Sequence, residues 1–268
     1  RTVFSQYKDV ISAEGIWHPG VWDEYDRRVQ RRKWREGEEL LCLRDFRGFR
    51  KREVKISVSE AVVRAGEWIA VTGRNGAGKS TLLHALMQLI RTQGDYRLLG
   101  DDVKQRQPLH RHIAFVFQNP EFQFVTHSVR DELAYSLRLE GRSSEETEET
   151  VARLLREFDL VGQQDTHPYQ LSVGQKRRLS VAASVVAGQR LFLLDEPTFG
   201  QDAKNTFALL EMLESYREQG AAIVMVTHDE QIVRRFATRR WVIEGGALVQ
   251  DERLGIRELA FAEGGAGQ

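Results

Sequence analysis

The sequence feature that most restricts the possible folds is a glycine-rich segment that matches the pattern G-x-x-x-x-G-K-[ST]. The apolar stretch Trp68–Val71 predicts a strand directly before it, and a helix is predicted directly after it, from about Lys79 to Leu89. Glycines allow successive backbone N–H groups to face an anion, and the start of the helix adds its positive end. The segment therefore predicts a phosphate-binding loop. Its residues are Gly73, Arg74, Asn75, Gly76, Ala77, Gly78, Lys79, Ser80 and Thr81.

Two side chains of this loop, and two acids further on, have predicted chemical roles. We expect Lys79 to reach the β- and γ-phosphates of ATP and Ser80 to ligate Mg²⁺. Asp195 and Glu196 follow the apolar stretch Leu191–Leu194. We assign Asp195 to the metal shell and Glu196 to the attacking water, because in-line attack on a phosphate needs an oriented acceptor. Alone, the two acids are equally compatible with a strand end that faces solvent; beside a phosphate loop, the hydrolytic interpretation is favoured.

Short apolar strands alternate with helices along most of the chain, which is typical of an α/β fold with a parallel sheet covered on both faces. Before them, apolar runs at 40–43, ahead of a charged turn, and at 54–58 predict an antiparallel piece. Helical runs interrupt the alternation between 128 and 172, so we expect a helical subdomain inserted into the core. The remaining predicted elements are strands at Ile113–Phe117, Leu191–Leu194 and Ala222–Val226, and helices that follow Ser128, Ser143, Ser172 and Asp202.

The first part of the chain, residues 1–38, is interpreted as a linker or appendage. It is rich in tryptophan, with Trp17, Trp22 and Trp34. Trp22, Tyr25 and Val29 lie at helical spacing, so a short helix that docks on the main body is favoured over a ligand site for the tryptophans. Residues 39–250 form the predicted nucleotide-binding domain. The helical subdomain is placed at about 128–175, and a C-terminal tail at 251–268.

Composition narrows the function classes. Lys plus Arg and Asp plus Glu each total 39, so no global positive field favours a nucleic-acid partner. No apolar run approaches the roughly 18 residues that cross a bilayer, so any membrane role is expected to be peripheral. The single cysteine, Cys42, excludes an internal disulfide and is interpreted as a small core residue in a reducing compartment. Because the chain starts at Arg1, we expect it to be trimmed or part of a longer protein.

Smaller motifs now point to one family. Leu171-Ser-Val-Gly-Gln175 resembles the signature motif of ATP-binding cassette (ABC) proteins and begins shortly before Asp195, as in that family. Gln118 is similar to the family's Q-loop glutamine, Asp202 to its D-loop aspartate and His228 to its switch histidine. Because the motifs follow the family's order, the resemblance covers about residues 39–250. It implies a P-loop NTPase core, catalytic roles for Lys79, Gln118, Glu196 and His228, and metal contacts from Ser80, Gln118 and Asp195.

The resemblance also implies an ATP site shared between two domains. In the family, the phosphate loop of one domain faces the signature helix of another, which gives nucleotide contacts to Ser172, Gly174, Gln175 and Asp202. One departure is Val173, a β-branched residue where the family has glycine, and we expect altered affinity with retained function. Arg74 stands where proline or serine is common, at a position whose side chain can face solvent.

An aromatic residue upstream of the phosphate loop stacks on adenine in this family. Phe49 is the best match and Phe46 the second, although a place in the core is equally compatible with each. Phe122 and Phe124, close to Gln118, put apolar side chains on a loop. We favour a groove for a membrane subunit over simple packing there.

Two longer stretches, Phe117–Gln123 and Asp195–Asp202, resemble the ATPases of energy-coupling-factor (ECF) importers, which bring vitamins and transition-metal ions into prokaryotic cells. The second stretch is most similar to the second half of tandem ATPases of the thiamine-precursor or cobalt type. The resemblance implies a peripheral ATPase on the cytoplasmic face of the cell membrane. Its partners would be a second cassette, joined head to tail as a tandem half, another chain or its own copy, and a transmembrane subunit near Gln118.

Two rival functions are weighed against the importer. A cassette acting in translation or DNA repair would be expected to carry a long coiled coil, a zinc site or a basic arm, and none is visible. A regulatory cassette would bind ATP without turnover, and the presence of both Glu196 and His228 argues against it.

Overall fold

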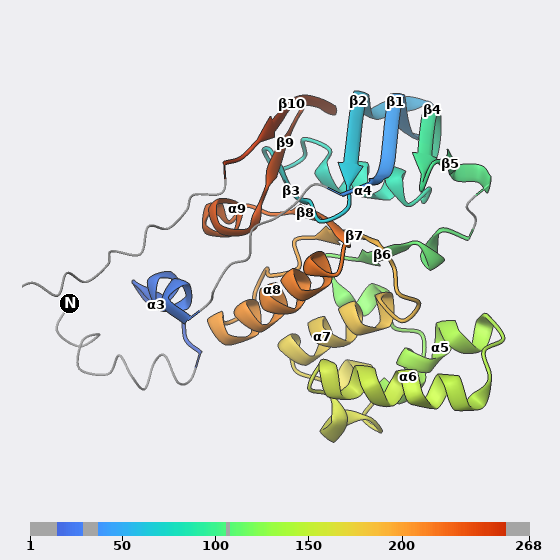
Figure 1. Cartoon of the computed structure of the whole chain (residues 1–268), viewed down its shortest axis with the longest axis vertical. Coiled ribbons are helices and arrows are strands. Elements are labelled where there is room, and N and C mark those ends of the chain that lie inside the picture. Colours follow the sequence, from blue (N-terminus) through green and yellow to red (C-terminus); the bar gives the residue numbers. More distant parts are fainter. Residues whose placement is uncertain (1–14, 29–36, 106–107, 256–268) are drawn as a thin grey trace, which may run out of the picture.

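The computed structural model describes residues 15–28, 37–105 and 108–255. Within them, one curled sheet has the strand order β5-β4-β1-β2-β10-β9-β3-β8-β7-β6. Strands β9, β3, β8, β7 and β6 pair in parallel, whereas β1, β2, β4 and β5 pair antiparallel. Figure 1 shows the antiparallel strands at one end of the molecule and helices α5, α6 and α7 at the other. The predicted α/β fold with an N-terminal antiparallel piece is confirmed.

Four of the five strands of the parallel core are short and apolar because they are covered on both faces; the fifth, Arg239–Glu244, begins with two arginines and ends with a glutamate. They are β3 (Trp68–Thr72), β6 (Ile113–Val116), β7 (Leu191–Asp195), β8 (Ala222–Val226) and β9 (Arg239–Glu244). The remaining strands are β1 (Glu39–Arg50), β2 (Glu53–Arg64), β4 (Arg91–Leu98), β5 (Asp101–Asp102) and β10 (Ala247–Arg253). The charged turn predicted between the apolar runs at 40–43 and 54–58 is shorter than expected: β1 continues to Arg50, with exposed Arg44 and Asp45 at a bulge, and the turn itself is Lys51–Arg52.

Polar residues begin the helices where the sequence predicted. The side chain of Ser128 accepts the Asp131 N–H, and Ser143 and Ser172 complete full capping boxes with Glu146 and Gln175. The helices are α3 (Val21–Arg28), α4 (Lys79–Leu86), α5 (Val129–Leu139), α6 (Ser144–Glu157), α7 (Val173–Ser184), α8 (Ala203–Glu218) and α9 (Glu230–Phe236). None of these helices, in the ranges the structure covers, combines the length and apolar character needed to cross a membrane.

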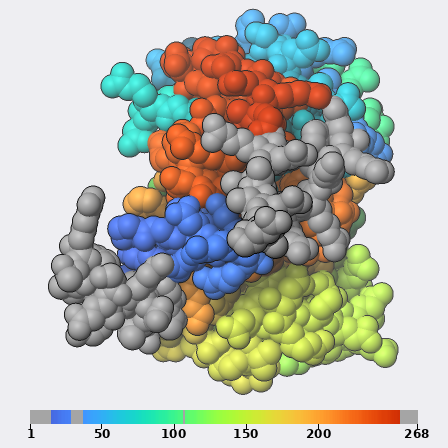
Figure 2. Space-filling model, turned by 60° about the vertical axis from the view of Figure 1, so that its left-hand side comes forward, coloured from blue at the N-terminus to red at the C-terminus, as the bar shows by residue number. Residues whose placement is uncertain are grey.

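The residues before the cassette dock on its body through α3. Tyr25 stacks on Phe207 of α8 with ring centres 4.5 Å apart, and the Trp22 ring lies 5.0 Å from the same phenylalanine. Arg235 of α9 donates from Nε to Asp26 Oδ2 over 2.8 Å. Figure 2 shows this segment, in blue, on the surface between the orange body and the yellow-green helices. The predicted docking is confirmed for Trp22 and Tyr25; Val29 and Trp34 lie outside the described residues.

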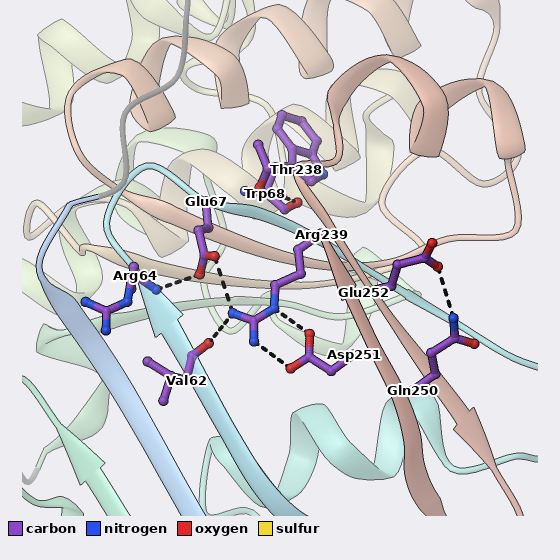
Figure 3. Close-up of polar contacts among 9 residues, drawn as sticks. All are labelled: Val62, Arg64, Glu67, Trp68, Thr238, Arg239, Gln250, Asp251 and Glu252. Carbon is purple, nitrogen blue, oxygen red and sulfur yellow. Dashed lines mark hydrogen bonds and ion pairs between the residues drawn. The ribbon is translucent and has the colours of Figure 1, made fainter. Parts of the chain in front are cut away.

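A partly buried ion cluster joins β9 and β10 to their neighbours in the sheet (Figure 3). Arg239 of β9 donates from Nη1 to the Val62 carbonyl over 2.9 Å, from Nη2 to Asp251 Oδ2 over 2.6 Å, and it faces Glu67 at 3.4 Å. The Glu67 side chain is 1% exposed, and it also accepts the Arg64 N–H over 2.7 Å. Burial alone would lower the Arg239 pKa, but hydrogen bonds and charges from Asp251 and Glu67 outweigh it and raise that pKa.

Candidate active site

The phosphate loop has the backbone that its glycines predict. Gly73 (φ +141°) allows so close an approach that a Cβ there would lie 2.2 Å from the Ile243 carbonyl oxygen of β9. Gly78 (φ +111°) precedes α4 in a left-handed conformation. The loop is also hydrogen-bonded to the turn between β9 and β10, where the Gly246 N–H donates to the Ala77 carbonyl over 2.9 Å. Arg74 is exposed, as expected, so the unusual residue does not crowd the loop.

Lys79 begins α4 and is turned into the loop. Its Nζ donates to the carbonyls of Gly73 at 2.8 Å and Arg74 at 3.1 Å. Burial lowers the Lys79 pKa from its ordinary value, while the nearby carboxylates of Glu196 and Asp195 act against that effect. The ammonium group therefore occupies the curled loop in which phosphate oxygens would be bound.

Glu196 is the meeting point of the other predicted catalytic residues. It follows β7 with φ +45°, a conformation that non-glycine residues rarely adopt. Its Oε1 lies 2.9 Å from His228 Nε2, and its Oε2 accepts a hydrogen bond of 3.4 Å from Gln118 Nε2. The structure thus brings together one carboxylate, one amide and one imidazole, which sequence reasoning assigned to separate motifs.

These residues face an open cleft of about 850 Å³. The phosphate loop contributes Asn75, Gly76, Gly78, Lys79, Ser80 and Thr81, and Gln118, Glu196, Thr227, His228 and Asp229 form further parts of its lining. Sequence reasoning missed a third contribution, which consists of Trp17, Thr198, Phe199, Gly200, Gln201 and Thr206. Four of these six residues could have been predicted to line the cleft from their position, because they closely follow Glu196 in the chain. Nothing in the sequence relates Trp17 to the cleft.

The residues predicted to hold a metal supply oxygen donors, which suit Mg²⁺. Ser80 and Gln118 line the cleft. Asp195 is 5% exposed at the end of β7, close enough to Lys79 to affect the pKa of the ammonium group. Mg²⁺ commonly keeps several waters and shares substrate phosphates, so this small donor set fits it without an all-protein cage.

The signature residues lie away from this cleft, and none of the residues that line it within the described part of the chain comes from 172–175. Ser172 caps α7, and Val173 is the first helical residue with an exposed side chain. Gly174 is buried, and a Cβ there would lie 2.7 Å from the Asn205 side chain of α8. Val173 therefore occupies a position that needs no glycine backbone, whereas Gly174 is required for packing.

The Q-loop, residues 117–123, is fastened to the signature helix. Arg177 of α7 donates to the carbonyls of Phe117 at 2.7 Å and Gln118 at 2.6 Å. Burial lowers the pKa of this guanidinium to about 10, with Asp195 acting in the opposite direction. Lys176 pairs with Glu121 at 2.6 Å. A rigid movement of α7 would therefore carry the loop that contacts Glu196.

The aromatic candidates for adenine differ in their surroundings. Phe46 is 1% exposed and packs edge-on against Tyr96, with ring centres 5.6 Å apart. It is therefore a core residue, and its suggested role in stacking is wrong. Phe49 is partly buried with the Arg91 guanidinium 5.5 Å from its ring centre, and it does not line the cleft. Its contact with adenine stays a prediction.

With this geometry established, the family model for the ABC transporter ATPase domain matches residues 57–199, more than half of the chain. The chain belongs to this family of ATP-binding, ATP-hydrolysing domains. A Pyrococcus furiosus protein named as an ABC transporter ATP-binding protein is 34% identical over 232 residues, which cover 85% of this chain and 80% of that protein.

Another relative carries a more particular name. YkoD of Bacillus subtilis, whose name assigns it to HMP/thiamine import as an ATP-binding protein, is 38% identical over 226 residues, or 83% of this chain. The chain spans only 34–41% of the length of YkoD and of two further relatives it matches.

Solved structures agree on the fold. A structure described as the ATP-binding subunit of an ABC transporter is 26% identical, has a TM-score of 0.71, and covers 80% of this chain and 90% of that one. The structure of cbiO1 from Clostridium perfringens, described as part of the transporter complex cbiONQ, is 24% identical with a TM-score of 0.71, covering 81% and 89%.

Proposed function

We propose that the chain is the ATP-hydrolysing subunit that energises an ECF-type importer of a vitamin or metal ion. The observation that carries this proposal is the position of the Q-loop between the site and the surface. At one end of the loop Gln118 donates a hydrogen bond to Glu196, and near the other end the side chain of Phe122 is exposed. The names of YkoD and of the cbiONQ complex support the class of transporter. On this proposal the subunit is bound peripherally to the cytoplasmic face of the membrane.

In the proposed cycle, ATP binds with its phosphates in the loop 73–81. Mg²⁺, held by Ser80, Gln118 and Asp195, would neutralise charge on the phosphates. Lys79 exchanges its two backbone carbonyls for β- and γ-phosphate oxygens, since an ammonium group gains more from the anionic partners. Glu196 orients the attacking water and accepts its proton, with His228 and Gln118 fixing the two carboxylate oxygens.

A second cassette supplies the missing side of the nucleotide. Ser172, Gly174 and Gln175 lie outside this chain's own cleft, yet Ser172 is exposed at the start of a helix, where backbone N–H groups favour an anion. We assign these three residues, and Asp202 near them, to the ATP held by the partner's phosphate loop. Two head-to-tail cassettes then enclose two nucleotides.

The transmembrane subunit docks beside the Q-loop. Phe122 is 75% exposed, and a neighbouring groove is lined by apolar side chains that include Leu89, Phe115 and Phe117. Phe124, expected to share this surface, is instead 7% exposed and packs against Tyr169 with ring centres 6.4 Å apart. Phe122 is therefore the docking residue, and Phe124 belongs to the core.

These two phenylalanines give a matched test of the proposal. Phe122→Glu should abolish substrate uptake by the assembled transporter in vesicles while the ATPase rate of the isolated cassettes stays at the parent level, because the charge meets only the docked subunit. Phe124→Glu, in contrast, should lower the melting temperature, since it buries a charge. Normal uptake with Phe122→Glu, or equal loss of fold in both variants, would remove the Q-loop from the docking surface.

A further inference from the structure

The residues just before α3 contact the loop that follows Glu196. Trp17 Nε1 donates to the Gln201 carbonyl over 2.8 Å, and the Ala203 N–H donates to the Gly15 carbonyl over 2.8 Å. Gly15 has φ +74°, and a Cβ there would lie 2.5 Å from Lys204 Cβ. Two hydrogen bonds and one close approach thus join a segment at the start of the chain to the beginning of α8.

The loop 197–202 is one of the elements that hold Glu196, whose N–H donates to the Val226 carbonyl of β8. Glu196 has the unusual φ of +45°, and such a conformation persists only where the surrounding structure enforces it. Within the loop, the Phe199 N–H donates to the Glu196 carbonyl over 3.2 Å, and Gln201 Nε2 donates to the Pro197 carbonyl over 2.8 Å. Gln201 itself is 9% exposed. Trp17 is hydrogen-bonded to Gln201, near the end of this loop that is distant from Glu196.

Trp17 is itself firmly placed. Its ring lies 5.8 Å from Phe207 and 6.0 Å from Trp22, and Trp22 continues into the docked face of α3. It is also 39% exposed and lines the nucleotide cleft. Docking alone explains the bond to Gln201, since a partly buried indole N–H normally finds an acceptor, but docking does not require a place in the cleft.

We propose that Trp17 is a positioning residue of the ATPase site: it fixes the loop 197–202 and, through that loop, the orientation of Glu196. The segment preceding the cassette is then a working part of the hydrolytic site. The same loop ends at Asp202, which accepts from both the backbone and the side chain of Asn205, and Asn205 packs on Gly174 of the signature helix. The segment is thereby connected both to the chain's own carboxylate and to the helix offered to a second cassette.

The test is a steady-state ATPase assay of the complete chain, over a range of ATP concentrations and at a chain concentration where the rate per cassette has reached its plateau. Trp17→Phe keeps an aromatic ring and removes the N–H donor. We expect kcat to fall about five-fold, the rate equivalent of one lost hydrogen bond, with KM for ATP unchanged and the melting temperature lowered by no more than about 4 °C. Trp22→Phe is the matched control, because it makes the same exchange in the same segment, and it should leave kcat unchanged.

Two further variants keep the proposal open to refutation. Gly15→Ala disturbs the same attachment from its other contact and should reproduce the loss of kcat if Trp17→Phe proves unstable. In a Glu196→Gln background, Trp17→Phe should lower single-turnover hydrolysis no further, because the group it positions has been removed. Equal kcat for both tryptophan variants, or the same loss with and without Glu196, would overturn the proposal.

The inference rests on the proposed role of Glu196 as the base, and the two can fail separately. If Glu196→Gln hydrolyses ATP at the parent rate, the assigned base is wrong. If Glu196→Gln is inactive while Trp17→Phe matches the parent, the base stands and only the positioning role is lost.

Discussion

At the scale of single residues, Lys79 allows the most decisive test of the site. It is the positive side chain placed inside the phosphate loop, held there by two carbonyl oxygens. Lys79→Ala should lower ATP turnover at least about a hundred-fold, comparable to the loss of one donor aimed at a reacting oxyanion. Turnover and nucleotide affinity are measured together, with Arg74→Ala as a control because Arg74 is exposed on the same loop. Unchanged values for Lys79→Ala would remove this residue from the site.

Glu196 permits a separation of binding from chemistry. Glu196→Gln keeps the shape and one acceptor oxygen but cannot take a proton, so hydrolysis should fall by roughly a hundred- to ten-thousand-fold. ATP should still bind, and the ATP-bound pair of cassettes should accumulate because it cannot be consumed. Size-exclusion chromatography with and without ATP reports this pair. Parent-rate hydrolysis would show that another group accepts the proton.

The sequence was informative for residues whose neighbours lie close along the chain. Lys79 and Ser80 could be predicted because the loop, the preceding strand and the following helix are contiguous. The contact between Trp17 and Gln201 joins residues 184 positions apart, and no local pattern encodes it. The suggested role of Phe46 failed for a related reason, since its burial depends on Tyr96 of a strand that the pattern did not reveal.

At the scale of elements, the cluster around Arg239 joins β9 to β10, β2 and the turn before β3. Arg239→Leu should lower the free energy of unfolding by about 3 kcal/mol, since it removes the cation facing a carboxylate that is 1% exposed. Denaturant unfolding measures this loss. Gln250→Ala on the neighbouring strand β10 removes only an exposed bond to Glu252 and should change stability by less than about 0.5 kcal/mol. Equal effects would mean that the cluster adds nothing specific.

Strands could be predicted from the sequence where they are buried, and helices where a capping motif marks their first residue. The core strands β3, β7 and β8 have continuous apolar runs, and α6 and α7 begin at complete capping boxes. By contrast, β4 and β10 are marked only weakly, because most of their residues are polar and their apolar residues are limited to Tyr96 and Leu98 in β4 and to 247–249 in β10. These strands exist because their backbone pairs with neighbours, and pairing across the sheet leaves little trace in the local sequence.

At the scale of the whole molecule, the proposed function gives one cassette half of each ATP site. None of the signature residues 172–175 lines the chain's own cleft, so on this proposal hydrolysis needs a second cassette. The ATPase rate of the chain should therefore rise more than linearly with protein concentration, and rise further when a separately made partner cassette is added. Rates strictly proportional to concentration down to the nanomolar range, and indifferent to a partner, would contradict the shared site.

The attachment of the phosphate loop to the last strands has a consequence for biosynthesis. In this loop Gly73 packs against the Ile243 carbonyl, and Ala77 accepts a hydrogen bond from the Gly246 N–H. The ribosome adds both Ile243 and Gly246 long after Lys79. Until residues 243–246 have been added, a nascent chain therefore carries its nucleotide-binding motif without the wall that shapes it. We therefore expect ATP to stabilise the chain only after these last strands have formed. Cellular nucleotide would then stabilise completed chains and leave truncated chains open to proteolysis.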